Sequence, residues 1–487
     1  MKSRWRFELA LNPLAKEPLF LQIARSVVDD VRRGRLRPGD ELPGSRSLAV
    51  SAGTHRNTVL AAYRELVAEG WLTVEPARGT FVSTELPEVS GRRFSATRRA
   101  MPARVGYDVG PLGPDLSPVT VGPNVLSLSG GIPDVRLIPT APLARAFRRA
   151  LRARSLLGYG DPRGPRVLRA ALGKMLSATR GLTASEDTVF VTRGSQMALD
   201  LVARTLVAPG DVVAVEALGY RWAWEAFRAA GARLVPLPVD ERGLRVDALE
   251  KLVKTERVRL VYVTPHHQYP TTVALSAGRR IELLTLAARE RIAVLEDDYD
   301  HEFHYNGRPI LPLASADHAG VVVYIGTLSK VLAPGLRIGY VVAPEALVER
   351  LARVRAHVDR QGDLPLDSAV GELLEDGDVQ RHVRRVRRVY ATRRDVLVEA
   401  LGTAFGDRLS FEPPPGGTAL WAKVDSSIDV DAWSERALTC GVSFQAARYF
   451  AFDGRSRNFV RFGFAQLDEK ELQEAVRRLV AALRSGR

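Results

Sequence analysis

The chain has 487 residues, and its 70 Lys and Arg against 56 Asp and Glu give a formal net charge of +14. That length exceeds one ordinary hydrophobic core, so we expect two or more domains. The single cysteine, Cys440, excludes an intrachain disulfide, and the lack of a signal-peptide core or of a membrane-length apolar run predicts a cytoplasmic protein without a membrane partner.

Half of the excess positive charge lies near the N-terminus. Residues 1–105 hold eighteen Lys and Arg against eleven Asp and Glu, a surplus of seven. Such a concentration is typical of a segment that binds a polyanion. Arginine is abundant throughout the chain, however, and a generally arginine-rich composition explains the surplus as well, so charge alone does not decide the matter.

The first eighty residues carry three helical patterns and then a hairpin pattern. Apolar residues recur at helical spacing over residues 17–33, a short second helix is predicted at residues 45–50, and a third at residues 54–69. Residues 71–82 indicate two short strands around a basic tip. We therefore predict a winged helix–turn–helix domain over residues 12–83, whose recognition helix begins with the polar side chains of Arg56, Asn57 and Thr58.

This N-terminal segment resembles the GntR family of regulators at residues 37–43, 56–59 and 79–82. Two positions depart from the family pattern at helix starts, since Gly44 replaces a serine and Thr54-His55 replaces Val-Ser. The alternative is that the arginines merely solvate a helix and a hairpin. The resemblance implies a double-stranded DNA operator as partner, contacted by Arg46, Arg56, Asn57, Thr58 and Arg78.

Residues 84–124 show neither helical nor strand periodicity. The segment is basic and then rich in Pro and Gly, and we interpret it as a linker. Its charges are expected to be solvated, with nonspecific contact to DNA phosphates as the alternative. The charges in question belong to Arg92, Arg93, Arg98, Arg99 and Arg104.

From about residue 126 the chain alternates β-branched runs with helical stretches. This pattern predicts an α/β domain over residues 125–487, with a largely parallel sheet in a large part at about residues 165–340 and a small part at about residues 345–487. Ligands of open α/β sheets bind at the carboxyl ends of the strands. Five predicted strands are each followed there by functional groups, namely Gly194-Ser195-Gln196, Tyr220, His266-His267-Gln268, Asp297-Asp298-Tyr299 and Lys330.

The last of these groups, within residues 326–340, places one lysine and one arginine among hydroxyl groups and glycines. A lysine amine forms a Schiff base with a carbonyl compound, and Thr327, Ser329 and Arg337 are suited to bind a phosphate. A helix that opens at Gly194, Ser195 and Gln196 also favours a phosphate, because its first backbone amides are free. The pattern indicates a phosphorylated aldehyde bound at Lys330.

Three further residues suit such a ligand. Asp297, at a strand end, is placed to hydrogen-bond a pyridinium nitrogen, Tyr299 to reach the phenolic oxygen of the ring, and Tyr220 to stack on the ring. The alternative is that each of these residues has only a structural role, as a cap, core or surface residue. Asp297 and Asp298 also form a possible metal pair, but we expect no metal, because the nearby His301 and His304 are predicted to be surface residues.

The large domain resembles fold-type I aminotransferases, and its fusion to a winged helix resembles the MocR branch of GntR regulators. The matching motifs lie at residues 158–164, 194–200, 296–300, 326–330 and 461–465. The resemblance implies an α+β winged helix–turn–helix domain joined to an α/β fold-type I domain, with pyridoxal 5'-phosphate on Lys330. It also implies a homodimer, in which Tyr159 reaches the phosphate of the partner subunit and Arg461 binds the carboxylate of an effector.

Several positions depart from the aminotransferase pattern. Tyr269 replaces the asparagine that steadies the ring oxygen, so either His267 or Gln268 supports that oxygen instead or no side chain does. Thr272 stands in place of a glycine, and Ala217-Leu218 replace an acidic residue and a proline. These changes affect substrate geometry more than cofactor retention.

Two functions fit this sequence. The first is a transcriptional regulator that senses pyridoxal phosphate, or a small amino compound that forms an external aldimine, without physiological turnover. The second is an active aminotransferase that also binds DNA.

Overall fold

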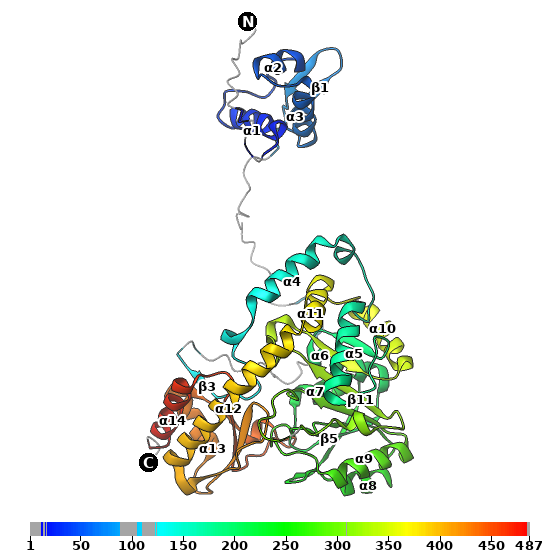
Figure 1. Ribbon diagram of the computed structural model, residues 1–487, viewed down its shortest axis with the longest axis vertical. Helices are drawn as coiled ribbons and strands as arrows, with labels where there is room; N and C mark the ends of the chain where they lie inside the picture. Colours follow the sequence, from blue (N-terminus) through cyan, green and yellow to red (C-terminus); the bar gives the residue numbers. More distant parts are fainter. Residues whose placement is uncertain are drawn as a thin grey trace. The chain divides into compact units, whose positions relative to one another are not determined.

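The computed structural model describes residues 11–12, 15, 17–87, 105–109, 122, 124–307 and 309–484. The chain divides into two compact units, Met1–Leu112 and Gly113–Arg487, and the division falls inside the predicted linker (Figure 1). The linker arginines at positions 92, 93, 98, 99 and 104 lie outside the described residues. Their interpretation therefore stays a prediction.

The described residues of the N-terminal unit form three helices and an antiparallel hairpin, in the predicted order. Its helices have apolar side chains three or four residues apart, and five of these side chains, Ile23, Val27, Leu48, Val59 and Leu66, are fully buried in one core. The predicted winged helix–turn–helix is confirmed. The elements are α1 (Leu19–Arg32), α2 (Ser45–Ser51), α3 (Arg56–Ala68), β1 (Leu72–Glu75) and β2 (Gly79–Val82).

Both helices of the helix–turn–helix begin without a side-chain cap. The N-cap residue is Gly44 in α2 and His55 in α3, and neither accepts a hydrogen bond from a first-turn amide through its side chain. These are the two places where the sequence departs from the GntR pattern. Glycine is tolerated at an N-cap, whereas histidine is not among the favoured residues, so the start of α3 is the less stable of the two.

The second unit is built on a seven-stranded sheet with the strand order β4-β12-β11-β10-β9-β5-β6. All its strands run parallel except β12, which is antiparallel to both of its neighbours, so the predicted largely parallel sheet is confirmed. The strands are β4 (Val189–Thr192), β5 (Val212–Glu216), β6 (Arg233–Leu237), β9 (Val258–Val263), β10 (Ala293–Asp298), β11 (Val322–Thr327) and β12 (Gly339–Val342).

Helices cover both faces of this sheet (Figure 1). Along β9, Leu260 and Tyr262 face one layer and Val261 and Val263 the other, because successive side chains of a strand point to opposite faces. The first layer consists of α6 (Gly194–Leu206), α7 (Arg221–Ala229) and α10 (Glu345–Val358). The second layer consists of α4 (Thr140–Arg152), α5 (Arg166–Arg180), α8 (Val246–Val253), α9 (Ala277–Glu290) and α11 (Leu364–Glu375).

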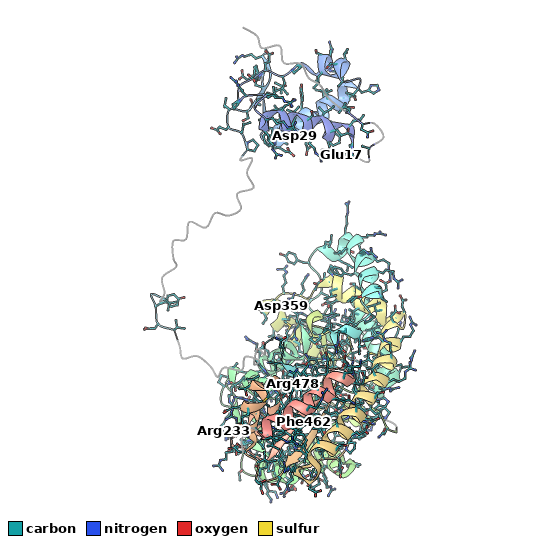
Figure 2. The ribbon with its side chains drawn as sticks, turned by 90° about the vertical axis from the view of Figure 1, so that its left-hand side faces the viewer. Glu17, Asp29, Arg233, Asp359, Phe462 and Arg478 are labelled. Carbon is teal, nitrogen blue, oxygen red and sulfur yellow. The ribbon has the colours of Figure 1, made fainter. Side chains whose placement is uncertain are left out.

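The small part has a four-stranded antiparallel sheet, in the order β13-β14-β17-β16, packed against helices. Phe462 of this sheet is fully buried, and Arg478 ties the last helix to the loop at Gly441 through a 2.8 Å hydrogen bond (Figure 2). The elements are α12 (Asp378–Phe405), β13 (Leu409–Ser410), β14 (Ala419–Val424), α13 (Val430–Thr439), β15 (Val442–Ser443), β16 (Gln445–Ala446), β17 (Phe459–Gly463) and α14 (Glu469–Arg484).

The bounds of the small part differ from the predicted residues 345–487. Helices α10 and α11 pack on the cores of the large part, through residues such as Leu351 and Leu373, so the small part begins in α12. It also includes a segment from the start of the unit, because β3 (Leu126–Ser127) pairs with β15. A short hairpin, β7 (Val239–Asp240) and β8 (Gly243–Leu244), completes the unit. No helix in the described part of the chain is long and apolar enough to cross a membrane.

The uncapped start of α3 leads to a first prediction. Replacing His55 by serine should stabilise the N-terminal unit by about 1 kcal/mol, because a serine hydroxyl accepts a hydrogen bond from the second or third amide of the helix. Hydrogen exchange of the α3 amides should slow by about fivefold. His55→Ala, which supplies no acceptor, is the control; equal exchange in both variants would show that the α3 amides are already satisfied.

Candidate functional site

The carboxyl ends of five parallel strands bring the predicted groups together. Strands β4, β5, β9, β10 and β11 end at the same edge of the sheet because they run in the same direction. The amine of Lys330, which follows β11, has Arg461, Asp300, Asp297 and Arg337 as its charged neighbours. Side chains from distant segments therefore surround one lysine.

The surroundings of Lys330 favour its neutral form. Burial is the largest effect, and with the positive charge of Arg461 it lowers the pKa of Lys330 to about 8, although Asp300 and Asp297 act in the opposite direction. A neutral amine attacks a carbonyl, whereas an ammonium group does not. Lys330 is thus a better nucleophile near neutral pH than a solvated lysine.

Two glycines that sequence reasoning missed line the same place. A Cβ atom on Gly131 would lie 3.7 Å from Nζ of Lys330, and one on Gly130 would lie 2.0 Å from Nη1 of Arg461. No side chain fits at Gly130, so the backbone itself passes over the guanidinium group. The glycine pair just after the first strand of the unit is the signal that could have identified this segment.

Asp297 lies near the end of β10 with one oxygen engaged and one free. Its Oδ2 accepts a hydrogen bond of 2.8 Å from the hydroxyl of Tyr262, and its buried Oδ1 has no partner among the described residues. Burial raises the pKa of Asp297 to about 6, against the lowering effect of the Tyr262 bond. A cation placed at Oδ1 would favour the charged carboxylate. Tyr262, on β9, was not predicted.

Gly194 and Arg337 meet at the start of α6. Gly194 has a φ of +73°, and a Cβ atom there would lie 2.7 Å from Nη2 of Arg337, so glycine is required by both conformation and space. The guanidinium group donates to the carbonyl oxygen of Arg193 at 3.2 Å. Ser195 follows in the first turn, and Gln196 donates through Nε2 to the carbonyl of Trp222. Free helix amides beside a guanidinium group suit a phosphate.

The two hydroxyl residues before Lys330 behave differently. Thr327 Oγ1 donates to the carbonyl of Ile338 and accepts from the amide of Ser329. These bonds stabilise the loop before Lys330, so Thr327 does not offer the free donor that was predicted. Ser329 Oγ is buried and has no hydrogen-bond partner in the part of the chain that the structure describes. Ser329 is therefore the hydroxyl with an unused donor.

Aromatic side chains form a wall beside these groups. Tyr269 packs edge-on against Tyr220 and Tyr299, with ring centroids 5.5 and 5.9 Å apart, and the Arg461 guanidinium lies 4.6 Å from its ring centroid. The hydroxyl of Tyr299 donates to the carbonyl of His267 at 2.9 Å. It is thus engaged within the protein, which differs from the predicted role of reaching a ring oxygen. Tyr220 was predicted to stack on that ring, and this role stays a prediction.

Arg461 is a buried cation with two nitrogen atoms that form no hydrogen bond to the described residues. It lies on β17 of the small part with 1% of its surface exposed. Its Nε and Nη1 atoms have no partner among the described residues. Because an uncompensated buried charge is costly, this arrangement favours an anion as ligand, and a guanidinium group binds a carboxylate through two parallel hydrogen bonds.

His267 and Gln268, which precede the residue that replaces the aminotransferase asparagine, form hydrogen bonds within the protein. Burial opposes protonation of His267, but Asp300, 2.7 Å from its Nδ1, outweighs burial and raises the pKa of His267. The amide nitrogen of Gln268 donates to the carbonyls of Leu218 and Tyr269. The side-chain amide of Gln268 is therefore engaged within the protein, whereas the bond to Asp300 involves only Nδ1 of His267. Gln268 therefore fits the missing role less well, and support of the ring oxygen by His267 stays a prediction.

The prediction that His301 lies on the surface is wrong. His301 is 3% exposed, and its Nδ1 lies 3.1 Å from Asp298 Oδ2, because the turn after β10 folds back over the strand end. Burial works against ionisation of Asp298, yet His301 and the buried Arg180 hold its pKa well below the usual range. His304 is half-buried and contacts Arg387. No group of three or more metal-binding side chains occurs among the described residues.

Tyr159 lies exposed on the surface of its own chain. Its side chain is 79% exposed, and the Arg360 guanidinium lies 4.0 Å from its ring centroid. Its role toward the phosphate of a partner subunit stays a prediction.

The predicted DNA contacts lie on α2, α3 and the hairpin. Arg46, Arg56, Asn57 and Arg78 are exposed and Thr58 is half-buried. Arg56 donates through Nε to Ser45 Oγ at 3.3 Å, which links the starts of α2 and α3. Arg78 forms an ion pair with Glu75 and lies over the ring of Phe81. These positions are open to a ligand, and their contact with DNA stays a prediction.

Each of the two units matches a known protein family. Residues 19–82 match the family described as bacterial regulatory proteins, gntR family, and residues 123–479 match aminotransferase class I and II. In solved structures, the large unit is similar to LysN, the alpha-aminoadipate aminotransferase of Thermus thermophilus, complexed with N-(5'-phosphopyridoxyl)-L-leucine. That similarity has a TM-score of 0.69 at 32% identity and covers 74% of this chain and 93% of the other.

One relative matches about three quarters of this chain, and another matches nearly the whole chain. The 2-aminoadipate transaminase of Thermus thermophilus is 34% identical over 377 residues, which cover 76% of this chain and 93% of that protein. The probable rhizopine catabolism regulatory protein MocR of Rhizobium meliloti is 31% identical over 476 residues, which cover 97% of this chain and 95% of that protein. The chain therefore belongs to the MocR-type GntR regulators, in which a winged helix–turn–helix domain precedes a class I and II aminotransferase domain.

Proposed function

We propose that this regulator binds pyridoxal 5'-phosphate covalently at Lys330 and that it changes its binding to operator DNA when the cofactor or a small amino compound occupies the crevice. The proposed domains are residues 12–83 for DNA, 84–124 for the linker and 125–487 for the ligand. Because DNA is its partner, the protein would act in the cytoplasm. Coupling between two such sites ordinarily amounts to about 1 to 3 kcal/mol.

One observation carries the proposal: a lysine of lowered pKa shares its surroundings with three groups that have unused hydrogen-bonding capacity. These are Asp297 Oδ1, Ser329 Oγ and the Arg461 guanidinium, none of which is satisfied within the described residues. They fit the ring nitrogen of the cofactor, its phosphate and the carboxylate of an amino acid. A protein that left these groups buried without any ligand would lose stability at each of them.

Each residue of the site has a proposed task. When bound, pyridoxal phosphate supplies an aldehyde and a ring that withdraws electrons. Lys330 provides the neutral amine, and Asp297 holds a proton on the ring nitrogen while Tyr262 fixes its orientation. The start of α6 and Arg337 bind the phosphate, with Ser329 as a further donor. Arg461, placed over Tyr269, orients the carboxylate of the effector.

A homodimer completes the proposal. Tyr159 is exposed on its own chain and is proposed to reach the phosphate of the partner subunit. Two symmetry-related winged helices would then read two half-sites on the operator. The small-molecule effector would be an amino compound that carries a carboxylate, or a form of vitamin B6.

Replacing Lys330 by alanine tests the covalent site. The full chain mixed with excess pyridoxal phosphate should show the visible absorption band of the lysine-bound cofactor, and Lys330→Ala should lose it entirely. Lys423→Ala, an exposed lysine of β14, should keep the band. An unaltered band in Lys330→Ala would exclude Lys330 as the point of attachment.

The pH dependence of cofactor capture follows from the charges around the lysine. The capture rate, followed by stopped-flow absorbance, should rise with pH through the Lys330 pKa of about 8, because only the neutral amine reacts. Arg461→Gln removes a positive charge that lowers this pKa, so its midpoint should move to higher pH. Arg455→Gln, an exposed control, should leave the midpoint in place. A midpoint that falls in Arg461→Gln would contradict the assigned electrostatics.

Arg56→Ala tests the DNA face. It should weaken operator binding by about tenfold, measured by fluorescence anisotropy, and leave the visible band of the cofactor intact. Arg64→Ala, an exposed arginine farther along the same helix, should have a much smaller effect. A change in the band without a change in DNA binding would show that the domain roles are misassigned.

An active aminotransferase that also binds DNA is the alternative, and the similarity to 2-aminoadipate transaminase favours it. The two functions differ in turnover. Sustained amino transfer to a keto acid at enzyme-like rates would support the alternative, whereas ligand-dependent DNA binding with no more than a single transfer would support the sensor.

A further inference from the structure

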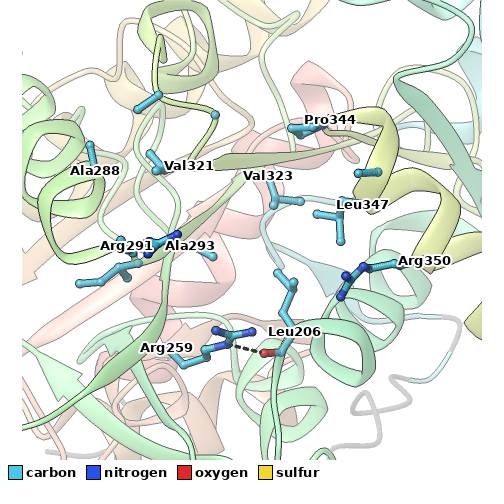
Figure 3. Close-up of a pocket in the computed structure, with 14 residues that line it drawn as sticks. Leu206, Arg259, Ala288, Arg291, Ala293, Val321, Val323, Pro344, Leu347 and Arg350 are labelled. Atoms are coloured by element: carbon cyan, nitrogen blue, oxygen red, sulfur yellow. Dashed lines mark hydrogen bonds between the residues drawn. The ribbon is translucent and has the colours of Figure 1, made fainter.

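A cavity lies at the edge of the central sheet opposite to the strand ends that surround Lys330, and Figure 3 shows the residues that line it. It has a volume of about 530 Å³ and is formed by the starts of β9, β10 and β11, the end of α6 and the start of α10. Helix α6 has thirteen residues, begins at Gly194 beside Arg337 and ends at Leu206 in this cavity. At about 1.5 Å per residue, about 20 Å separate the two places.

The cavity is lined by positive charge that nothing in the described part of this chain neutralises. Arg259, Arg291 and Arg350 line it, and none of the three forms an ion pair with a described residue. Every described residue along its wall is neutral apart from these arginines. All three arginines are exposed to solvent, and an anion bound among them would be attracted by each.

One of the arginines is held in place by the end of a helix. Nε of Arg259 donates to the carbonyl oxygen of Leu206 at 2.7 Å. Arg259 and Arg350 lie on either side of Leu206 in Figure 3, and Arg291 lies beside Ala293. The three arginines therefore come from separate elements and line one cavity only in the folded chain.

The rest of the wall is apolar. Val323 is 4% exposed, and Leu206 and Leu347 are partly buried against the same core. A hollow of several hundred cubic ångströms with an apolar floor and a few convergent polar groups is the usual form of a small-molecule site. A DNA backbone, in contrast, presents closely spaced charges and little apolar surface to bind such a floor.

We propose that this cavity binds a small anion with an apolar body, namely an aryl or acyl compound that carries a carboxylate, sulfonate or phosphate. The arginines bind the anionic group and the floor binds the apolar body. The site is independent of the proposed cofactor function, since it shares no lining residue with the surroundings of Lys330.

Isothermal titration of the full chain, saturated with pyridoxal phosphate, with 2-naphthalenesulfonate tests the proposal. The probe should bind one site per chain, and inorganic sulfate and 2-naphthalenemethanol, which each lack one half of it, should bind at least about tenfold more weakly. Arg350→Ala and Arg259→Ala should each lower the affinity by about fivefold.

The matched control is Arg353→Ala, an exposed arginine on the same helix that does not line the cavity and should leave the affinity unchanged. Circular dichroism melting should be the same for all the variants. Lack of saturable binding, an equal loss in Arg353→Ala and Arg350→Ala, or equally tight binding of sulfate alone would overturn the proposal. Loss of binding in Arg337→Ala would also overturn it, because the probe would then occupy the crevice of Lys330.

Discussion

The site of the large unit depends on one arrangement of charges: the buried amine of Lys330 lies among two carboxylates and two guanidinium groups. Burial and the two arginines favour the neutral lysine, while Asp297 and Asp300 favour the charged one, and the balance places its pKa near neutrality. No short stretch of chain can present these charges together. The parallel sheet does so because its strands end at one edge, and the small part adds Arg461 from a different sheet.

The junction between the large and small parts is itself built from polar groups. Asp300, two residues beyond β10, bonds to His267. A Cβ atom on Gly416 would lie 2.6 Å from His267 Nε2, and one on Gly417 would lie 3.0 Å from Asp300 Oδ2. The amide of Gly417 donates to the carbonyl of Phe303 at 2.6 Å. Movement of the small part, which carries Arg461, would therefore also shift Asp300 and the end of β10, the strand that holds Asp297.

Much of this arrangement could be predicted from the sequence, because strand ends and helix starts leave local patterns: the groups at Gly194, Asp297 and Lys330 each follow an apolar run. Tyr262 could not, since a tyrosine inside an apolar strand looks like a core residue. Only the pairing of β9 with β10, in which Tyr262 lies beside Leu295, brings its hydroxyl to Asp297. Burial of His301 and the bounds of the small part likewise depend on long-range packing that periodicity does not encode.

The pairing of β3 with β15 also shapes the surroundings of Lys330. Leu126 is held in this pairing, and four and five residues later the backbone at Gly130 and Gly131 lies close to Arg461 and Lys330, respectively. Whatever occupies the crevice must share space with Gly130 and Gly131. A ligand that displaced this backbone would therefore also disturb the pairing of β3 with β15, which joins the start of the unit to its small part.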